Sequence, residues 1–334
     1  MPKGPTSKDV ARLAQVSQST VSYVMSGKRA ISEETRHRVE AAIAQLTYQP
    51  HAGARALAGQ RSNAIAVIMP FASPGSAQKL MAFVEEITEA ARRRDYDVLL
   101  VTADEGSDGI RRVVGRSLCD AVLVMEVGAH DDRADAVREL SLPVIFIGVP
   151  EESSQLHCVD FDFEQAGELL VHELADLGHR VIDLLRWDAS PTGQEFNYVP
   201  RFARGVDRVA QARGVEVRTH EPGAYRDMGD FVQEVQSHNR HRPGLVLTTS
   251  ITETMQELQR RQLQPGEDVD VLLLSSLPHD ETWGVTRVST QQREVARRVM
   301  RRLFALVDAE ISTPSVELVP ARVDSASAVT VASS

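Results

Sequence analysis

The chain has 334 residues and a formal net charge of −10, and this length exceeds one small core, so two or three domains are expected. The charge is uneven, because residues 1–63 carry nine Lys and Arg against four Asp and Glu, which leaves a net −15 on the remainder. No apolar run approaches the roughly 18 residues of a membrane span, and residues 1–5 lack the apolar core of a signal peptide. We therefore expect a cytoplasmic protein with no membrane partner.

Residues 6–26 predict two short helices joined by a tight turn. Thr6 can cap the first helix, with Asp9 completing a capping box, and Ser17 is a suitable cap for the second helix. In the first helix, the apolar residues expected to face inward are Val10, Leu13 and Ala14. Two helices in this arrangement are typical of the helix-turn-helix, whose second helix lies in the major groove of DNA. The alternative is that two small helices simply pack together.

The outward face of the second helix is polar, with the residues Gln18, Ser19, Thr20, Ser22 and Tyr23. Hydroxyl and amide groups at a helix N-terminus suit hydrogen bonds to phosphates and base edges, because unpaired backbone N–H groups there attract anions. A third helix is expected from Ser32 to about Leu46. Together these elements predict an all-α, three-helix head over residues 1–50.

Residues 51–62 predict a linker with a short, Ala-rich helix. An isolated helix of this length is marginal in water. Its large apolar residue, Leu57, has no partner within the segment, so we expect a second chain or the DNA to bury it.

Residues 6–62, including the sequence RALAGQRS at 55–62, resemble the DNA-binding head of the LacI family of repressors. The resemblance implies a homodimer on near-palindromic double-stranded operator DNA, with the hinge helices in the minor groove. It implies base contacts by Gln18, Ser19 and Tyr23. It implies phosphate contacts by Thr6, Ser17, Thr20, Ser22, Ser32 and Thr35. It places Ala54, Arg55 and Leu57 at the minor groove. The family often has Arg where this chain has Tyr23, and Tyr cannot pair bidentately with guanine, so we do not expect a familiar operator sequence.

Residues 63–334 predict alternating strands and helices. The expected strands are 65–71, 97–102, 121–127, 143–149, 181–186, 215–219, 244–248 and 269–274. The expected helices are 78–94, 163–177, 202–213, 227–239, 251–261 and 291–309. Repeated βα units indicate parallel, doubly wound sheets, and their number favours two lobes. This arrangement resembles the two-lobed, periplasmic-binding-protein-like effector domain of the same family, which implies crossovers near 159–162, 289–291 and 318–320.

Such lobes bind a ligand at the carboxyl ends of their strands. The predicted contacts to a small-molecule effector are Phe71, Ser73, Glu126, Gly148, Arg201, Thr249, Ser250, Ser275 and Ser276. The family commonly has amides and carboxylates after two of these strands, where this chain has only Thr and Ser. Because those groups pair with sugar hydroxyls, their replacement argues against a typical sugar ligand. The alternative for each position is a solvated loop.

The sequence contains no nucleophile elbow, phosphate-cradling glycine loop or metal-ligand motif, so we predict no catalytic residue, no metal and no cofactor. Cys119 and Cys158 lie in strand-like runs and are expected to be buried free thiols. The predicted function is a dimeric, sequence-specific transcription regulator, with repression as the expected mode, controlled by a small molecule bound between the lobes. The alternatives are a cytoplasmic solute-binding protein or an enzyme of the same architecture.

Overall fold

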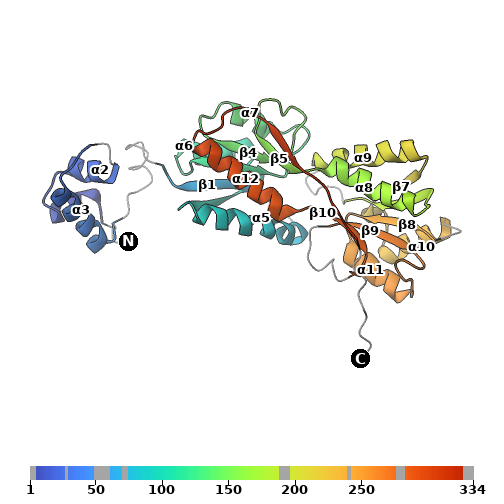
Figure 1. The fold of residues 1–334 in the computed structure, drawn as a ribbon. Helices are drawn as coiled ribbons and strands as arrows, with labels where there is room; N and C mark the ends of the chain where they lie inside the picture. Colours follow the sequence, from blue (N-terminus) through green and yellow to red (C-terminus); the bar gives the residue numbers. More distant parts are fainter. Residues whose placement is uncertain are drawn as a thin grey trace.

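The computed structural model describes residues 5–26, 29–48, 61–69, 74–187, 196–238, 242–275 and 283–325. A small helical head comes first in the chain, followed by two α/β lobes, each built on a six-stranded sheet (Figure 1). The multidomain fold predicted from the sequence, with an all-α head and a two-lobed α/β part, is confirmed.

The head is built from three described helices, α1 (Ser7–Leu13), α2 (Gln18–Ser26) and α3 (Glu33–Leu46). They enclose a small core that consists of Val10, Ala11, Ala14, Val21, Val39, Ala42 and Tyr48. The prediction for Leu13 is wrong, because this side chain is 43% exposed. The buried face of α1 is formed by Val10, Ala11 and the following Ala14, and Leu13 lies to the side of this face.

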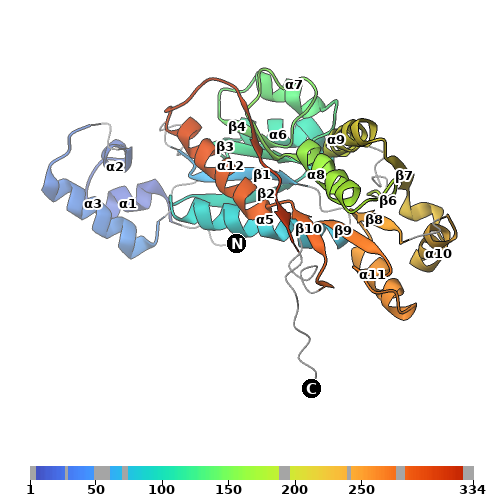
Figure 2. The same ribbon diagram turned by 45° about the vertical axis from the view of Figure 1, so that its right-hand side comes forward.

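The first lobe has the strand order β11-β5-β4-β3-β1-β2, and all of its strand pairs are parallel. Its strands are β1 (Ala64–Met69), β2 (Asp97–Thr102), β3 (Ala121–Met125), β4 (Val144–Ile147), β5 (Cys158–Phe161) and β11 (Val316–Val319). Its helices are α5 (Pro74–Arg92), α6 (Gly106–Gly115), α7 (Asp132–Arg138) and α12 (Gln292–Val307). Helices α5 and α12 lie side by side in both ribbon views (Figures 1 and 2).

The second lobe has the strand order β12-β10-β9-β8-β6-β7. Its strands are β6 (Val181–Leu185), β7 (Glu216–His220), β8 (Gly244–Leu247), β9 (Asp270–Ser275), β10 (Thr286–Ser289) and β12 (Val323–Asp324). Its helices are α8 (Phe163–Asp176), α9 (Tyr198–Arg213), α10 (Met228–His238) and α11 (Ile251–Arg260). The sheet is parallel except for β12, which runs antiparallel to β10.

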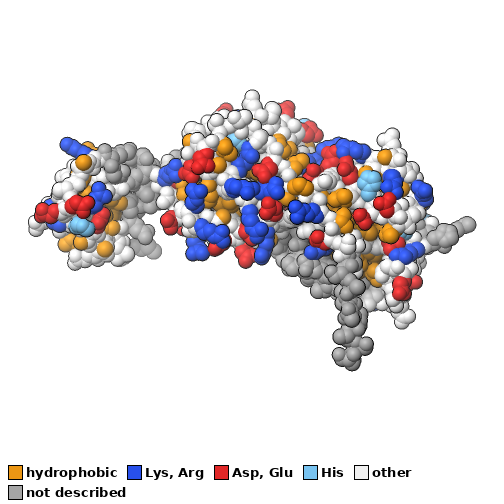
Figure 3. Space-filling view, viewed as in Figure 1, with side chains coloured by type: hydrophobic (Ala, Val, Ile, Leu, Met, Phe, Trp, Pro, Cys, Tyr) orange, Lys and Arg blue, Asp and Glu red, His pale blue; other side chains and the backbone are white. Residues whose placement is uncertain are grey.

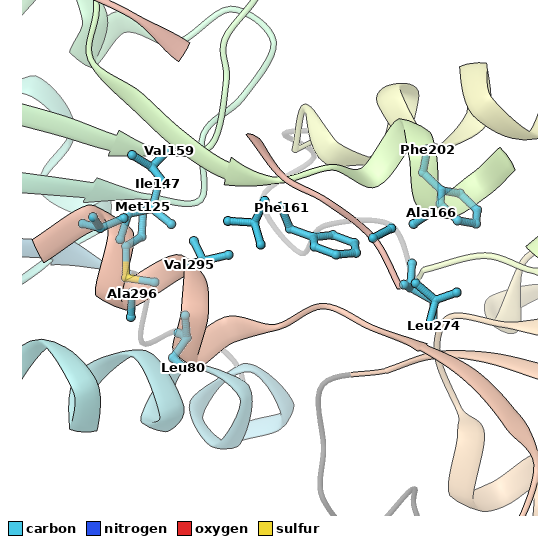
Figure 4. Packing of buried hydrophobic residues seen from close by; sticks show 14 of the residues in the cluster. Leu80, Met125, Ile147, Val159, Phe161, Ala166, Phe202, Leu274, Val295 and Ala296 are labelled. Carbon is cyan, nitrogen blue, oxygen red and sulfur yellow. The ribbon is translucent and has the colours of Figure 1, made fainter. Parts of the chain in front are cut away.

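The chain crosses between the lobes after β5, after β10 and between β11 and β12, as the sequence predicted. Figure 4 shows the apolar packing at the first crossover. Phe161 lies there between Met125 and Ile147 of the first lobe and Leu274 of the second, and all of these residues belong to one buried cluster. Because this cluster runs through both lobes, a change in their relative orientation has to repack it.

Helices α8 and α9 of the second lobe touch through their backbones. A Cβ added at Gly205 would lie 1.9 Å from the carbonyl oxygen of Glu164, and one at Gly167 would lie 2.5 Å from that of Phe202. These two positions therefore exclude any side chain without separation of the helices.

The exposed faces of α5 and α12 carry interleaved charges of both signs (Figure 3). Arg293 pairs with Glu85 at 3.0 Å, and Arg297 pairs with Glu86 at 3.2 Å. The predicted buried thiols are confirmed at Cys119 and Cys158, where burial raises the pKa to about 11 and about 12.

Candidate functional site

Polar side chains gather at the start of each described helix of the head. The backbone N–H and the hydroxyl of Thr6 donate to Asp9 Oδ2 at 2.9 and 2.6 Å, and these bonds lower the pKa of Asp9. Ser17 Oγ accepts the backbone N–H of Thr20 at 3.1 Å and lies 2.8 Å from its hydroxyl. Ser32 caps α3 by accepting the backbone N–H of Thr35 at 3.4 Å. The predicted phosphate contacts Thr6, Ser17, Thr20, Ser32 and Thr35 thus all occupy helix starts, where backbone N–H groups favour an anion.

The predicted base-reading residues Gln18, Ser19 and Tyr23 are exposed on α2, as is Ser22. Gln18 Nε2 donates to Ser7 Oγ at 2.7 Å, which connects the start of α2 to the start of α1. Val21, on the opposite side of α2, is fully buried in the head core. The helix therefore has one apolar face fixed by packing and one polar face available to a partner.

A residue that the sequence reasoning missed, Arg29, lies over this polar face. Its guanidinium carbon is 5.6 Å from the centroid of the Tyr23 ring, and the Arg29 side chain is exposed. The signal for Arg29 was weak, because a single basic residue in a loop has no periodic pattern.

The predicted minor-groove residues Ala54, Arg55 and Leu57 lie outside the described residues, so their role stays a prediction. The chain that follows them is fixed to the first lobe by two carboxylates. Asp120 accepts the backbone N–H and the hydroxyl of Ser62 at 2.7 Å each and the N–H of Asn63 at 2.9 Å.

The second carboxylate, Asp308, directly follows α12. It pairs with Arg61 at 3.5 Å and with Arg94 at 2.9 Å, and Arg61 also donates to the carbonyl of Val307 at 2.9 Å. Residues 61–63 are thus held by Asp120, directly before β3, and by the end of α12.

On the first-lobe side of the inter-lobe region, the register of the parallel strands places Glu126, Gly148 and Asp160 in one row at the carboxyl edge of the sheet. Glu126 has a positive φ of 51°, and the buried Arg133 donates to its carbonyl at 2.8 Å. Burial raises the pKa of the Glu126 carboxyl to about 7, although the charge of Arg133 opposes the rise. Gly148 has a φ of 134° and leaves no space for a Cβ, which would lie 2.7 Å from the side chain of Val127.

Arg201 reaches from α9 to this row and forms an ion pair with Asp160. It also donates to the carbonyl of Phe161 at 3.3 Å, and it is only 5% exposed. Burial raises the pKa of Asp160 to about 6, and Arg201 opposes that rise. The guanidinium that we predicted to contact an effector is thus already engaged inside the protein.

On the second-lobe side, the strand register places Trp187, Thr249 and Ser275 in a row at the carboxyl edge of the sheet. Thr249 and Ser250 are half-buried, and the carbonyl of Ser250 accepts the hydroxyl of Thr254 at 2.8 Å. Ser275 is buried. The predicted contacts Phe71, Ser73 and Ser276 lie outside the described residues. The structure therefore groups the predicted loop residues on two facing edges, and a ligand contact for any of them stays a prediction.

Aromatic side chains that the sequence reasoning missed lie between these edges. Tyr198 stacks on Phe163, with ring centroids 5.0 Å apart, and meets the edge of Trp187 at 5.1 Å. Trp187 also contacts Phe202 at 5.2 Å. Burial raises the pKa of Tyr198 most strongly, and the charges of Glu126 and Asp160 raise it further. The aromatic rings therefore lie close to the carboxyl groups of Glu126 and Asp160.

The two lobes also meet through backbone and amide groups at the start of α9. The N–H of Asn197 donates to the carbonyl of Val127 at 2.9 Å, and its side-chain amide donates to the carbonyl of Val149. Phe196 forms a β-bridge with Gly128. A segment of the second lobe is thus bound to the loops that follow β3 and β4 of the first.

Within the described part of the chain, no group of three or more His, Cys, Asp or Glu is placed to hold a metal ion. No described helix is long and apolar enough to cross a membrane.

A helix-turn-helix head joined to two parallel α/β lobes with three crossovers defines the class of two-lobed regulatory proteins, and comparison with known sequences agrees. Residues 6–51 match bacterial regulatory proteins of the lacI family. Residues 69–198 match the periplasmic binding proteins and sugar binding domain of the LacI family, and residues 171–325 match a periplasmic binding protein-like domain. The chain belongs to the LacI family.

Among its relatives, the HTH-type transcriptional regulator MalR of Staphylococcus xylosus is 30% identical over 249 residues, which are 73% of this chain and 72% of MalR. Catabolite control protein A of Priestia megaterium is 28% identical over 68% of this chain and 66% of its own length. The same protein from Staphylococcus epidermidis is matched over 57% of its length, so the aligned region spans between half and two thirds of these two relatives. The Lac repressor dimer bound to operator and the anti-inducer ONPF has the same fold, with a TM-score of 0.77 at 20% identity, over 96% of this chain and 98% of that one.

Proposed function

We propose that the protein is a sequence-specific transcription regulator that binds near-palindromic operator DNA as a homodimer. The observation that carries this proposal is the exposed polar face of α2, with Gln18, Ser19 and Tyr23 outward and Val21 buried behind it. A helix supported in this way can enter the major groove as a rigid element. Membership in the LacI family and the operator complex of the Lac repressor support the same function.

In this function the helix starts of the head bind the DNA backbone. Each of these helix starts combines backbone N–H groups with a hydroxyl, which suits a phosphate oxygen. The head carries more basic than acidic residues, whereas the remainder is acidic, so electrostatic attraction orients the head toward the DNA.

The proposed regulatory site is the inter-lobe region between Glu126 and Trp187. Its aromatic rings, and the Glu126 carboxyl whose pKa burial raises, differ from a surface rich in amides and carboxylates, which supports an effector other than a simple sugar. The relative MalR is a transcriptional regulator, and we propose that this chain likewise acts by binding and not by catalysis. Since its proposed target is chromosomal DNA, we propose that the protein acts in the cytoplasm.

The test is binding of the purified full-length protein to genomic fragments, followed by selection of a binding sequence. We expect selective binding that Ser19→Asp abolishes, because a carboxylate on the polar face of α2 repels the phosphates. The matched control is Gln211→Asp on the exposed side of α9, which adds the same charge far from the head. Equal loss in both variants, or no selective binding by the unaltered protein, would contradict the proposal.

A further inference from the structure

We propose that Arg29 reads a guanine in each half of the operator, with the ring of Tyr23 as the platform that orients it. This inference rests on the proposed function, because it assigns a base preference to the same helix. The observation behind it is the position of the Arg29 guanidinium over the Tyr23 ring, at 5.6 Å from the ring centroid.

The position of Tyr23 places this pair on the face that approaches DNA. Tyr23 lies four residues after Ser19, so the two side chains are neighbours on the same side of α2. The Tyr23 side chain is 37% exposed, and Val21 on the other side of the helix is fully buried. A guanidinium over this ring is therefore also on the outer side of the head.

The position of the guanidinium over the ring is compatible with the chemistry that base recognition requires. A guanidinium over an aromatic ring uses its flat face for the contact, and its N–H groups remain free in the plane. Those N–H groups form the fork that pairs with O6 and N7 of guanine, which is the commonest specific contact in the major groove. A phenol has one hydroxyl and cannot make this pair, so within the pair Tyr23 orients the arginine and Arg29 supplies the donors.

The charge of Arg29 and the restricted motion of its side chain both favour a role in base recognition. Among the described residues of the head, Asp9 pairs with Arg12, and no carboxylate is paired with Arg29. The guanidinium is thus available to a partner. The contact with the Tyr23 ring limits the conformations of a long side chain before binding, which reduces the entropy lost when DNA binds. A lysine in the same place would keep the charge but lose both the flat stacking face and the fork.

The experiment compares base preferences of full-length variants on the sequence selected by the unaltered protein. Arg29→Lys should bind the backbone nearly as well but lose roughly tenfold to hundredfold of the preference for one G·C pair in each half-site. Tyr23→Phe keeps the ring and should keep that preference, whereas Tyr23→Leu should lose it. Arg36→Lys, an exposed arginine on α3, is the matched control and should change no base preference.

Replacement of that guanine by 7-deazaguanine removes the N7 acceptor and should weaken the unaltered protein but not Arg29→Ala. Thermal unfolding of each variant verifies that the head remains folded. If both Arg29 variants weaken all sequences equally, or bind as the unaltered protein does, Arg29 does not read a base and the inference fails while the proposed function stands. If the unaltered protein selects no sequence, the proposed function fails and this inference with it.

Discussion

Polar side chains are brought together by a single helix in the head but by distant segments of the chain in the inter-lobe region. In the head, Gln18, Ser19 and Tyr23 come from one helix, and their exposure follows from its periodicity. Between the lobes, Glu126, Asp160 and Trp187 come from three strands that are far apart in the chain and meet only through sheet register and crossovers. A local pattern can thus specify a surface that reads another molecule, whereas a site between domains depends on the whole topology.

The largest effect is expected for the buried ion pair of the inter-lobe region. Asp160→Ala should lower the free energy of unfolding of the two-lobed part by about 3–5 kcal/mol at pH 7.5, because the charge of Arg201 would remain buried without a partner. The double variant Asp160→Leu with Arg201→Met should recover most of that loss. Urea unfolding followed by circular dichroism measures both.

A matched ion pair on the surface sets the scale for that measurement. Glu168→Ala removes a partner of the exposed Arg208, and exposed pairs contribute only about 0–1 kcal/mol. If Asp160→Ala costs no more than Glu168→Ala, the pair with Arg201 is not an essential part of the inter-lobe packing.

The next largest effect is expected in the head, on the polar face of α2. Gln18→Ala should reduce discrimination between operator variants by about 1–3 kcal/mol at one base pair, whereas Thr20→Ala should weaken all sequences alike. Binding arrays distinguish the two results. Ser7→Ala is the control, because it removes only the internal partner of the Gln18 amide. An unchanged preference in Gln18→Ala would mean that another side chain reads this base.

A smaller effect is expected where the head joins the body. Asp120→Ala should remove the acceptor of two backbone amides, so local opening at Ser62 and Asn63 should become easier by about 1–2 kcal/mol. Hydrogen–deuterium exchange of a peptide that contains both residues measures this opening. Asp97→Ala, on the exposed start of β2, is the control. Equal exchange in Asp120→Ala and the unaltered protein would show that other contacts fix this junction.

The last prediction concerns the protonation of Glu126. Its pKa in the folded protein is raised to about 7 from an ordinary value of 4.5, so the folded state binds more protons than the unfolded state between these values. Stability from this group is therefore lost as the pH rises from 4.5 to 7. Glu126→Gln should remove that slope, and thermal unfolding at several pH values measures it. Parallel curves for both proteins would exclude a buried, shifted Glu126.

The sequence was informative wherever short-range patterns decide the structure. It predicted the helix caps at Thr6, Ser17 and Ser32 and most of the buried strands, because capping chemistry and apolar runs are local. It failed for Leu13, because an i, i+3, i+4 apolar spacing did not reveal that Ala11 and not Leu13 completes the buried face of α1. It also missed the contact of Phe163 with Tyr198, since nothing in either segment indicates that the fold brings their rings together.

The backbone contact of α8 and α9 makes these two helices of the second lobe one rigid unit. With Gly167 and Gly205 pressed against the facing carbonyls, neither helix can slide past the other without a collision. Shear between these two helices is thereby blocked. Asn197 is the N-cap of α9 and Arg201 lies within the same helix. Both residues therefore have to leave the first lobe together. An opening of the lobes is therefore expected to be a single cooperative step with no half-released state.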